Sequence, residues 1–437
     1  MRGSVSPHFR GDATLRIVQT MERQSCSLLQ GAPRAMLLLA AITPSFGCSL
    51  IVSDPTFVDP FDAGRDAGTS PDAGRDAGIS DAGGRDALVT SDASCELGTL
   101  ENCTACGESC VWSCTPTGCN DANHLSLGYS HACVSRQRDG IACWGWNDTF
   151  CLGDGTLTDS ALPVEAAFEG RFIDVCAGGS IIGTHFSCAL TATGIVSCWG
   201  SNLFGTLGSA SAPNPSMTPF PVGLVNRASM IDCGEFFACA LLDNGEIWCW
   251  GSRPEVPSQE PRLVGGLSAR PVQLAVGSFH ACALLETGTV QCWGGNTGGA
   301  LGDRTTTDRA DAVAAIGVNN AVLVAAGVHD SCVAIRSGEV LCWGNGYGPT
   351  PVAVPGVAGP RSLTTSCAGL DDGVVCWSAG GPAASVAGTA GPFVRVSTGV
   401  AHCGLTEQGA VYCWGDGPLG SGVMSSASAL LVPAPRG

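Results

Sequence analysis

The chain has 437 residues, of which 45% are hydrophobic and 14% charged, and its formal net charge is −17. This apolar content is sufficient for a packed core and excludes a wholly disordered chain. The 21 basic residues are all arginine and face 38 acidic residues. Such a balance argues against nucleic acid as a partner, because phosphate backbones are bound through basic surfaces. No apolar run reaches the roughly 18–20 residues of a spanning helix.

Residues 1–47 are predicted to be an N-terminal extension with a secretory signal. Arg23 and Arg34 precede a short apolar run over 36–42, and small residues lead from it to Cys48. A cysteine at the cleavage point resembles a bacterial lipoprotein signal, in which that cysteine is lipidated. We therefore expect lipidation of Cys48, with simple secretion as the alternative. The expected location is extracytoplasmic: the cell envelope, as an outer membrane lipoprotein, or the medium.

Residues 48–94 are predicted to form a disordered tether. The triplet Asp-Ala-Gly recurs from Asp62, Asp72 and Asp81, and the segment is small, acidic and poor in aromatic residues. Such a composition cannot bury enough surface to offset chain entropy. A calcium-binding repeat is the alternative, but it needs a regular ligand spacing that this segment lacks.

Residues 95–120 are predicted to be a small cysteine-rich module. Its six cysteines are Cys95, Cys103, Cys106, Cys110, Cys114 and Cys119. Closely spaced cysteines of an exported protein favour disulfides, whose connectivity the spacing does not define. A structural zinc site is the alternative, since four cysteines suffice for one.

Residues 121–437 contain seven repeats, each with two cysteines and a tryptophan directly after the second. Successive first cysteines are separated by 35 to 55 residues. A period of this size with short strands and glycine turns predicts a β-propeller. The pairs expected to be disulfides are Cys133 with Cys143, Cys188 with Cys198, Cys239 with Cys249, Cys282 with Cys292, Cys332 with Cys342, Cys367 with Cys376, and Cys403 with Cys413.

The spacing of each pair follows from hairpin geometry. Two runs of residues with the alternation typical of β-strands flank Gly194. A three-residue loop over 192–194 joins them and places Cys188 directly opposite Cys198. Counting outwards puts this pair at a non-hydrogen-bonded position, where Cα atoms are about 4.5 Å apart. The pair Cys367–Cys376 is one residue closer, and a two-residue turn over 371–372 would restore the opposition.

The remaining repeated residues are interpreted as structural. His131, His280 and His402 precede a first cysteine, with His185 and His329 one step further away. We expect these rings to pack or form hydrogen bonds rather than to hold a metal ion, and we expect the tryptophans to lie in the core. Outside the pairs are Cys151, Cys176 and Cys233, and a bridge between Cys151 and Cys176 is one hypothesis.

The frame Gly-x-x-His-x-Cys-Ala-Leu, a turn glycine, then Val-x-Cys-Trp-Gly-x-Asn and Leu-Gly resembles the repeat of the regulator of chromosome condensation (alpha-tubulin suppressor-like) family. The resemblance covers residues 124–437 and identifies the chain with a bacterial, cysteine-rich, secreted or lipoprotein member. It implies an all-β fold, a seven-bladed β-propeller with one hairpin disulfide per blade. It also implies that the two ends of the repeat region jointly complete one blade.

Three functions are weighed for this fold. The first is a non-enzymatic binding or scaffold protein at the bacterial cell surface, whose partner is an unknown protein or glycan. The second is guanine-nucleotide exchange, which the family resemblance implies. The third is a sialidase-like hydrolase, suggested by the segment 243–248, which lacks a nucleophile and base. The first is our prediction: a monomer with no cofactor, no nucleic acid, and membrane contact only through a lipid anchor.

Overall fold

The computed structural model describes residues 114–115, 118–119, 121–252 and 258–435. The predicted signal, the lipidation site Cys48, the tether and most of the cysteine-rich module lie outside the described residues. Strands β1 (Cys114–Thr115) and β2 (Gly118–Cys119) form a two-stranded antiparallel sheet. No helix in the described part of the chain combines the length and apolar character that crossing a membrane requires.

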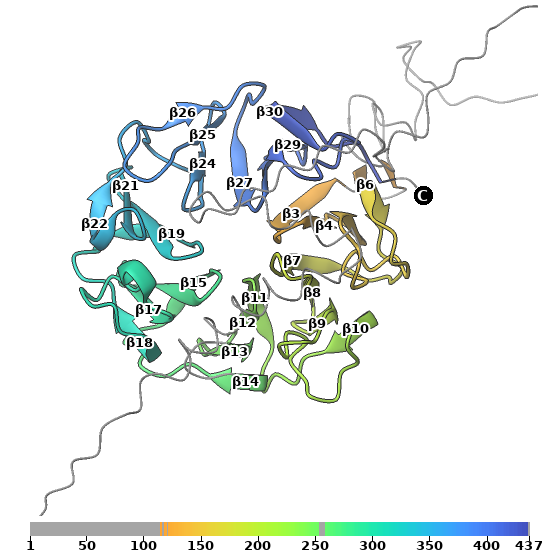
Figure 1. Ribbon diagram of the computed structural model, residues 1–437, viewed down its shortest axis with the longest axis horizontal. Helices are drawn as coiled ribbons and strands as arrows, with labels where there is room; N and C mark the ends of the chain where they lie inside the picture. Colours follow the sequence, from red (N-terminus) through yellow and green to blue (C-terminus); the bar gives the residue numbers. More distant parts are fainter. Residues whose placement is uncertain (1–113, 116–117, 120, 253–257, 436–437) are drawn as a thin grey trace, which may run out of the picture. The chain divides into compact units, whose positions relative to one another are not determined.

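Seven four-stranded antiparallel sheets follow and form the blades of a β-propeller (Figure 1). Blade 1 contains β3 (Ala122–Leu127), β4 (His131–Arg136), β5 (Ile141–Gly145) and β6 (Ser160–Glu165). Blade 2 contains β7 (Phe172–Gly178), β8 (Phe186–Thr191), β9 (Val196–Gly200) and β10 (Ser216–Pro221). Blade 3 contains β11 (Ala228–Cys233), β12 (Phe237–Leu242), β13 (Ile247–Gly251) and β14 (Ser258–Leu263).

The last four blades repeat this order. Blade 4 contains β15 (Pro271–Val276), β16 (His280–Leu285), β17 (Val290–Gly294), the 3₁₀ turn η2 (Thr297–Gly299) and β18 (Arg309–Ala314). Blade 5 contains β19 (Ala321–Ala326), β20 (Asp330–Ile335), β21 (Val340–Gly344) and β22 (Gly348–Ala353). Blade 6 contains β23 (Ser362–Leu363), β24 (Cys367–Gly369), β25 (Val374–Cys376) and β26 (Ala384–Ser385). Blade 7 contains β27 (Phe393–Thr398), β28 (Ala401–Thr406), β29 (Val411–Asp416) and β30 (Ser425–Leu431).

The hairpin between the second and third strands has the register that the sequence predicts. In blade 2, Cys188 is paired with Cys198 and Leu190 with Val196, and the amide of Thr191 donates to the carbonyl of Ile195 at 2.9 Å. Gly194 has φ 85°, the left-handed conformation that glycine adopts without a steric penalty. In blade 6 the amide of Leu370 donates to the carbonyl of Gly373 at 2.8 Å, which closes the shorter turn.

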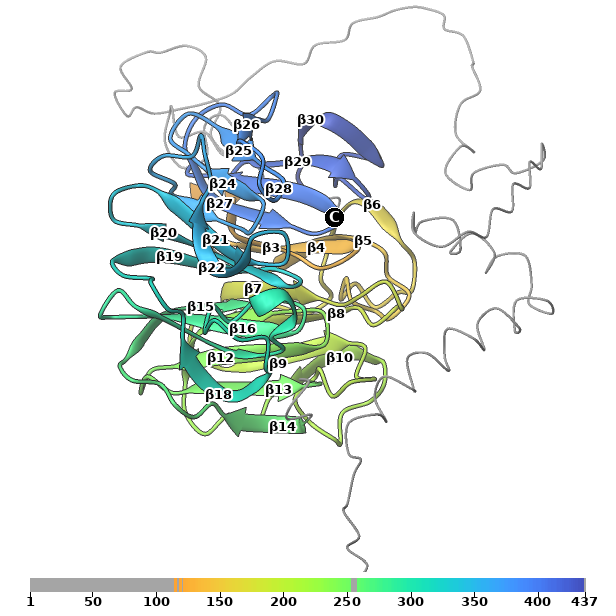
Figure 2. The ribbon, with the colours of Figure 1, turned by 60° about the vertical axis from the view of Figure 1, so that its left-hand side comes forward.

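Figure 2 shows the blades turned by 60°, with β27 and β28 of the last blade beside β3 of the first. The core consists of seven clusters, one between each pair of neighbouring blades. Each cluster includes the repeat tryptophan of the later blade packed against the earlier blade. The tryptophans are Trp144, Trp199, Trp250, Trp293, Trp343, Trp377 and Trp414. A buried tryptophan removes a large apolar area from water, so these rings stabilise the contacts between blades. The prediction that the tryptophans lie in the core is confirmed.

The expectation that both chain ends complete one blade is wrong. The first and last blades are each built from four consecutive strands, β3–β6 and β27–β30. They meet through side chains and through hydrogen bonds that include Arg395 Nε to the carbonyl of Leu125 at 2.8 Å and the amide of Leu127 to Ser397 Oγ at 2.9 Å. Two backbone bonds between loops also cross this interface, from Val400 to Tyr129 at 3.3 Å and from Gly422 to Ala161 at 3.0 Å. An apolar cluster around Trp144 and Leu405 completes this interface. The ring is therefore closed by packing rather than by a shared sheet.

Candidate functional site

Every blade contains a disulfide between its second and third strands, as predicted. The seven bonds join the pairs that the repeat spacing assigns, and their Cα–Cα distances are 4.0–4.1 Å. The opposed cysteines of an antiparallel pair bring their sulfurs together without displacing the backbone. These bonds fix the scaffold from which the loops of each blade extend.

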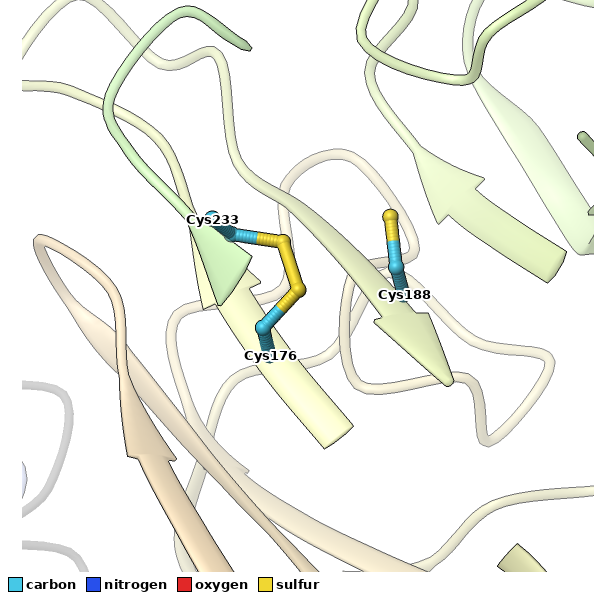
Figure 3. Close-up of side chains that lie close together, drawn as sticks. All are labelled: Cys176, Cys188 and Cys233. Carbon is cyan, nitrogen blue, oxygen red and sulfur yellow. A yellow bond between two sulfur atoms is a disulfide. The ribbon is translucent and has the colours of Figure 1, made fainter. Parts of the chain in front are cut away.

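An eighth disulfide joins Cys176 of β7 to Cys233 of β11, and thus links blades 2 and 3 (Figure 3). The hypothesis of a bridge between Cys151 and Cys176 is therefore wrong. Cys151 is a buried free thiol whose Sγ donates to the carbonyl of Trp146 at 3.0 Å. Burial raises the pKa of this thiol, so it is not a reactive nucleophile.

The sulfur atoms of Cys176, Cys188 and Cys233 lie within 4.8 Å of one another (Figure 3). Such a cluster of thiolates could bind a soft metal ion. In this structure, however, Cys176 is bonded to Cys233, and Cys188 is bonded to Cys198. The three sulfurs therefore serve as cross-links between and within blades.

The first strands of the blades line the axis of the propeller, and in blades 1, 2, 3 and 7 the fifth residue of this strand is bonded to the next blade. Ser126 Oγ accepts from the amide of Ala177 at 3.0 Å, and Asp232 Oδ2 accepts from the amide of Val276 at 2.7 Å. The Cys176–Cys233 bond occupies the same place between blades 2 and 3. One inter-blade position thus holds a hydroxyl, a carboxyl or a disulfide.

In blades 1, 2, 4 and 7 the third residue of the first strand also makes a polar contact with the next blade. His124 Nδ1 lies 2.7 Å from Asp174 Oδ1, and the other oxygen of Asp174 accepts from the amide of Ile231 at 3.2 Å. Burial opposes ionisation of Asp174, but His124 and Arg395 together hold its pKa below the usual range. Asp174 of blade 2 therefore links His124 of blade 1 to the backbone of blade 3 close to the axis.

An axial cavity of about 520 Å³ lies between these first strands. Asp232 is the fifth residue of β11, and Glu235 follows that strand in the loop to β12. Arg395 is only the third residue of β27, and Arg361 precedes β23. The charge of Arg395 acts on the carboxyl groups of Asp174 and Asp232, so acidic and basic groups meet within the cavity.

Histidines at the blade interfaces have the structural role that the sequence predicts. His131 Nε2 lies 2.9 Å from Ser187 Oγ, and His280 Nε2 lies 2.7 Å from Ser331 Oγ. All four side chains are fully buried or nearly so. Burial lowers the pKa of His280 to about 3, so its ring is neutral. Although each pair contains a serine and a histidine, each is enclosed between blades, where no substrate can reach it.

The segment 243–248 forms an ordinary hairpin turn. Asp243 is exposed, and Trp248 Nε1 donates to Glu246 Oε2 at 3.0 Å. The same turn position recurs in the other blades, which explains the weak likeness to a hydrolase motif. Among the residues that the structure describes, the hydroxyls hydrogen-bonded to a histidine ring are buried, and exposed hydroxyls bonded to a carboxylate, such as Ser337 with Glu339, lie in surface turns.

The fold and these contacts define a seven-bladed β-propeller with a disulfide in each blade. Profiles of the regulator of chromosome condensation (RCC1) repeat match residues 142–184, 231–252 and 272–300. These three segments are therefore similar to the RCC1 repeat, in agreement with the resemblance of the repeat frame.

Two curated relatives illustrate how much of the chain is shared. Human E3 ubiquitin-protein ligase HERC2 is 31% identical over 160 residues, which cover 34% of this chain and 3% of HERC2. The ultraviolet-B receptor UVR8 of Arabidopsis thaliana is 27% identical over 141 residues, which cover 31% of each protein. The match thus spans less than a third of either relative.

Solved structures share the fold at low sequence identity. Yeast RCC1 (Prp20), solved bound to Kap60, superposes with a TM-score of 0.57 at 17% identity, covering 68% of this chain and 84% of Prp20. A second structure of Prp20p from Saccharomyces cerevisiae, described with its binding to Gsp1p and histones, gives 0.57 at 18% identity, covering 68% and 86%. Human WBSCR16 gives 0.51 at 17% identity, covering 72% and 82%.

Proposed function

We propose that this chain is a non-enzymatic, extracytoplasmic binding protein of a bacterial cell envelope. In this proposal Cys48 carries the lipid anchor or the chain is secreted, residues 48–94 act as a tether, and the propeller presents its loops to a partner. The observation that carries the proposal is the pairing of cysteines: sixteen of the seventeen within residues 121–435 form eight disulfides.

The oxidised cysteines support an extracytoplasmic location because disulfides persist in oxidising compartments and are rare in the cytosol. Seven of the bonds join strands within a blade, and the eighth joins two blades. Because a hairpin disulfide recurs in each of the seven blades, oxidised cysteines are part of the fold around the whole propeller. A cytosolic chain would leave these sulfurs reduced and would gain nothing from their opposed placement.

Binding is favoured over catalysis by the location of the polar side chains. The serine–histidine pairs are sealed between blades, and the one free thiol, Cys151, is buried with a raised pKa. The loops, by contrast, extend from a rigid frame, and such loops commonly carry recognition sites. Prp20p, whose binding to Gsp1p and histones has been described, is a propeller with a binding role of this kind.

Nucleotide exchange is the second candidate, because three segments are similar to the RCC1 repeat and the fold superposes on Prp20p, whose binding to Gsp1p has been studied. The identity to that structure is 18%. We expect no acceleration of GDP release when the purified propeller is mixed with a small GTPase loaded with a fluorescent GDP analogue. Acceleration that increases with propeller concentration would make exchange the function.

The proposal is tested by alkylating the full chain with iodoacetamide in its cell, then denaturing it without reductant and alkylating it again with a heavier reagent. We expect neither label on the sixteen paired cysteines, the second label alone on Cys151, and an N-terminus at an acylated Cys48. First-label modification of the hairpin cysteines, with an unprocessed N-terminus, would place the chain in the cytosol and overturn the proposal.

A further inference from the structure

A row of aromatic rings crosses four blades on one face of the propeller. Phe204 and Phe236 have ring centroids 5.2 Å apart, Phe236 and Phe279 5.5 Å, and Phe279 and His329 5.0 Å. Phe236, Phe279 and His329 occupy the same repeat position, three residues before the first cysteine of blades 3, 4 and 5. All four rings are half-buried, so one part of each faces solvent.

The loops around this row expose further apolar side chains. Leu203 precedes Phe204 and is 59% exposed, and Val328 precedes His329 and is 50% exposed. Trp146 packs edge-on against His185 and is 46% exposed. We call these loops, which link the first to the second and the third to the fourth strands, the loop face. Exposed apolar residues that gather on adjoining loops mark an interaction surface, whereas scattered ones do not.

The loop face is also acidic. Glu235 directly precedes Phe236, Asp330 directly follows His329, and both carboxyl groups line the axial cavity. Burial raises the pKa of each carboxyl, and no arginine forms an ion pair with either among the described residues. Within the described loops of this face, Arg304 is the one basic residue.

The opposite face carries the arginines. This hairpin face consists of the turns between second and third strands and the connections between blades. Its described arginines are Arg138, Arg171, Arg227, Arg270, Arg336 and Arg361. Acidic residues lie in the same turns, where Arg227 pairs with Asp243 and Arg361 pairs with Asp371 and Glu407. The loop face, by contrast, combines apolar rings with the carboxyl groups of Glu235 and Asp330, which lack a cationic partner among the described residues.

We propose that the loop face binds a basic, partly apolar polypeptide segment of a partner protein. The apolar side chains of the segment lie on the aromatic row, and its lysine or arginine side chains reach Glu235 and Asp330 at the mouth of the axial cavity. A cation beside both a carboxylate and an aromatic ring is attracted by each. This inference rests on the proposed binding function, since it names the partner class for the same propeller.

The geometry favours a polypeptide over a glycan. Sugar rings stack on flat, open aromatic faces, but Phe204 and Phe236 meet edge to face at 86° and both residues are partly buried. The acidic loops also disfavour nucleic acid and anionic lipid, which carry the same sign of charge. A basic amphipathic segment satisfies both the apolar row and the carboxyl groups.

The test uses the oxidised full chain, with its disulfides verified by mass, and a fluorescent 18-residue peptide of leucine and lysine at helical spacing. Fluorescence anisotropy should show binding that weakens with salt. Phe236→Ser combined with Phe279→Ser should weaken it at least tenfold, and Glu235→Gln about threefold with a smaller salt dependence. The matched controls Leu263→Ser, an exposed apolar residue on β14, and Glu286→Gln, on the hairpin face, should leave the affinity unchanged.

Equal affinity of the peptide for all variants would show non-specific attraction to an acidic protein and would overturn the inference. Binding of chitohexaose that the double phenylalanine variant abolishes, without peptide binding, would overturn it in favour of a glycan. Neither result affects the proposed function, which is tested separately by the state of the cysteines in the cell and by the assay of GDP release. Near-ultraviolet circular dichroism of each variant shows that the fold is retained, and Glu235→Gln provides a test that leaves the apolar row intact.

Discussion

His280 Nε2 lies 2.7 Å from Ser331 Oγ, across the interface between blades 4 and 5. The serine hydroxyl donates to the carbonyl of Ala300 at 2.9 Å, and Trp343 Nε1 donates to the same carbonyl at 2.8 Å. Because the hydroxyl proton is used in that bond, the oxygen accepts from the histidine ring. Blades 1 and 2 repeat the arrangement through His131 and Ser187. A serine at this position therefore connects three groups from two blades.

Replacement of this serine should destabilise the propeller. Ser331→Ala leaves His280 Nε2 buried without a partner, and an unsatisfied buried donor costs about 1–3 kcal/mol. Urea unfolding of the oxidised protein measures the change in free energy. Ser337→Ala, which removes an exposed hydroxyl bonded to Glu339, is the control and should have an effect below about 0.5 kcal/mol. A loss no larger than that of the control would show that the inter-blade serine contributes nothing.

The Cys176–Cys233 disulfide should stabilise the fold more than any single hairpin disulfide. It closes a segment of 57 residues, whereas Cys282–Cys292 closes 10. The entropy of the unfolded chain then predicts about 4 kcal/mol for the former and about 3 kcal/mol for the latter. Thermal unfolding of the variants Cys176→Ala with Cys233→Ala, and Cys282→Ala with Cys292→Ala, tests the order. The prediction is wrong if the variant without the Cys282–Cys292 disulfide loses more stability than the variant without the Cys176–Cys233 disulfide.

The contrast between these disulfides shows what the sequence can predict. The hairpin bonds depend on local geometry: ten residues around a turn glycine place Cys188 opposite Cys198, and the structure has that register. The bond between Cys176 and Cys233 depends on how two blades meet, which no local spacing encodes. A signal was nevertheless present, since each of these cysteines lies in the first strand of its repeat, near the strand's end.

The aromatic row follows the same principle. Aligning the repeats on their first cysteine places Phe236, Phe279 and His329 at one position, and a propeller puts equivalent positions on one face. The sequence analysis considered the histidines of these segments but not the phenylalanines beside them. Phe204 comes from a different loop, and only the three-dimensional structure joins it to the row.

Acid should weaken the propeller through its buried histidines. Burial lowers the pKa of His280 to about 3, below the usual 6.5, so the unfolded chain binds a proton that the folded chain rejects. The resulting stability is present above pH 6.5 and is lost as the pH falls towards 3, by up to about 1.4 kcal/mol per unit. Melting temperatures between pH 7 and pH 4 should fall less steeply for His280→Gln than for the unmodified protein. Parallel curves for the two proteins would contradict this assignment.

The carboxyl group of Asp232 should have the opposite effect at higher pH. Burial raises its pKa to about 7 from the usual 3.8, although the amide of Val276 and the charge of Arg395 oppose the shift. The folded chain therefore holds a proton that the unfolded chain releases above pH 3.8. This contribution is complete below pH 3.8 and is lost as the pH rises through 7, by up to about 1.4 kcal/mol per unit.

Asp232→Asn removes this titration, so its stability should change less between pH 5 and pH 8 than that of the unmodified protein. The measurement is the difference in unfolding free energy between the two pH values, which cancels any constant cost of the substitution. Asp243→Asn, at an exposed carboxyl of the hairpin face, is the control and should follow the unmodified protein. If the stability of Asp232→Asn also changes between pH 5 and pH 8 as much as that of the unmodified protein, the carboxyl of Asp232 is ionised at pH 5. It then contributes a full negative charge to the axial cavity.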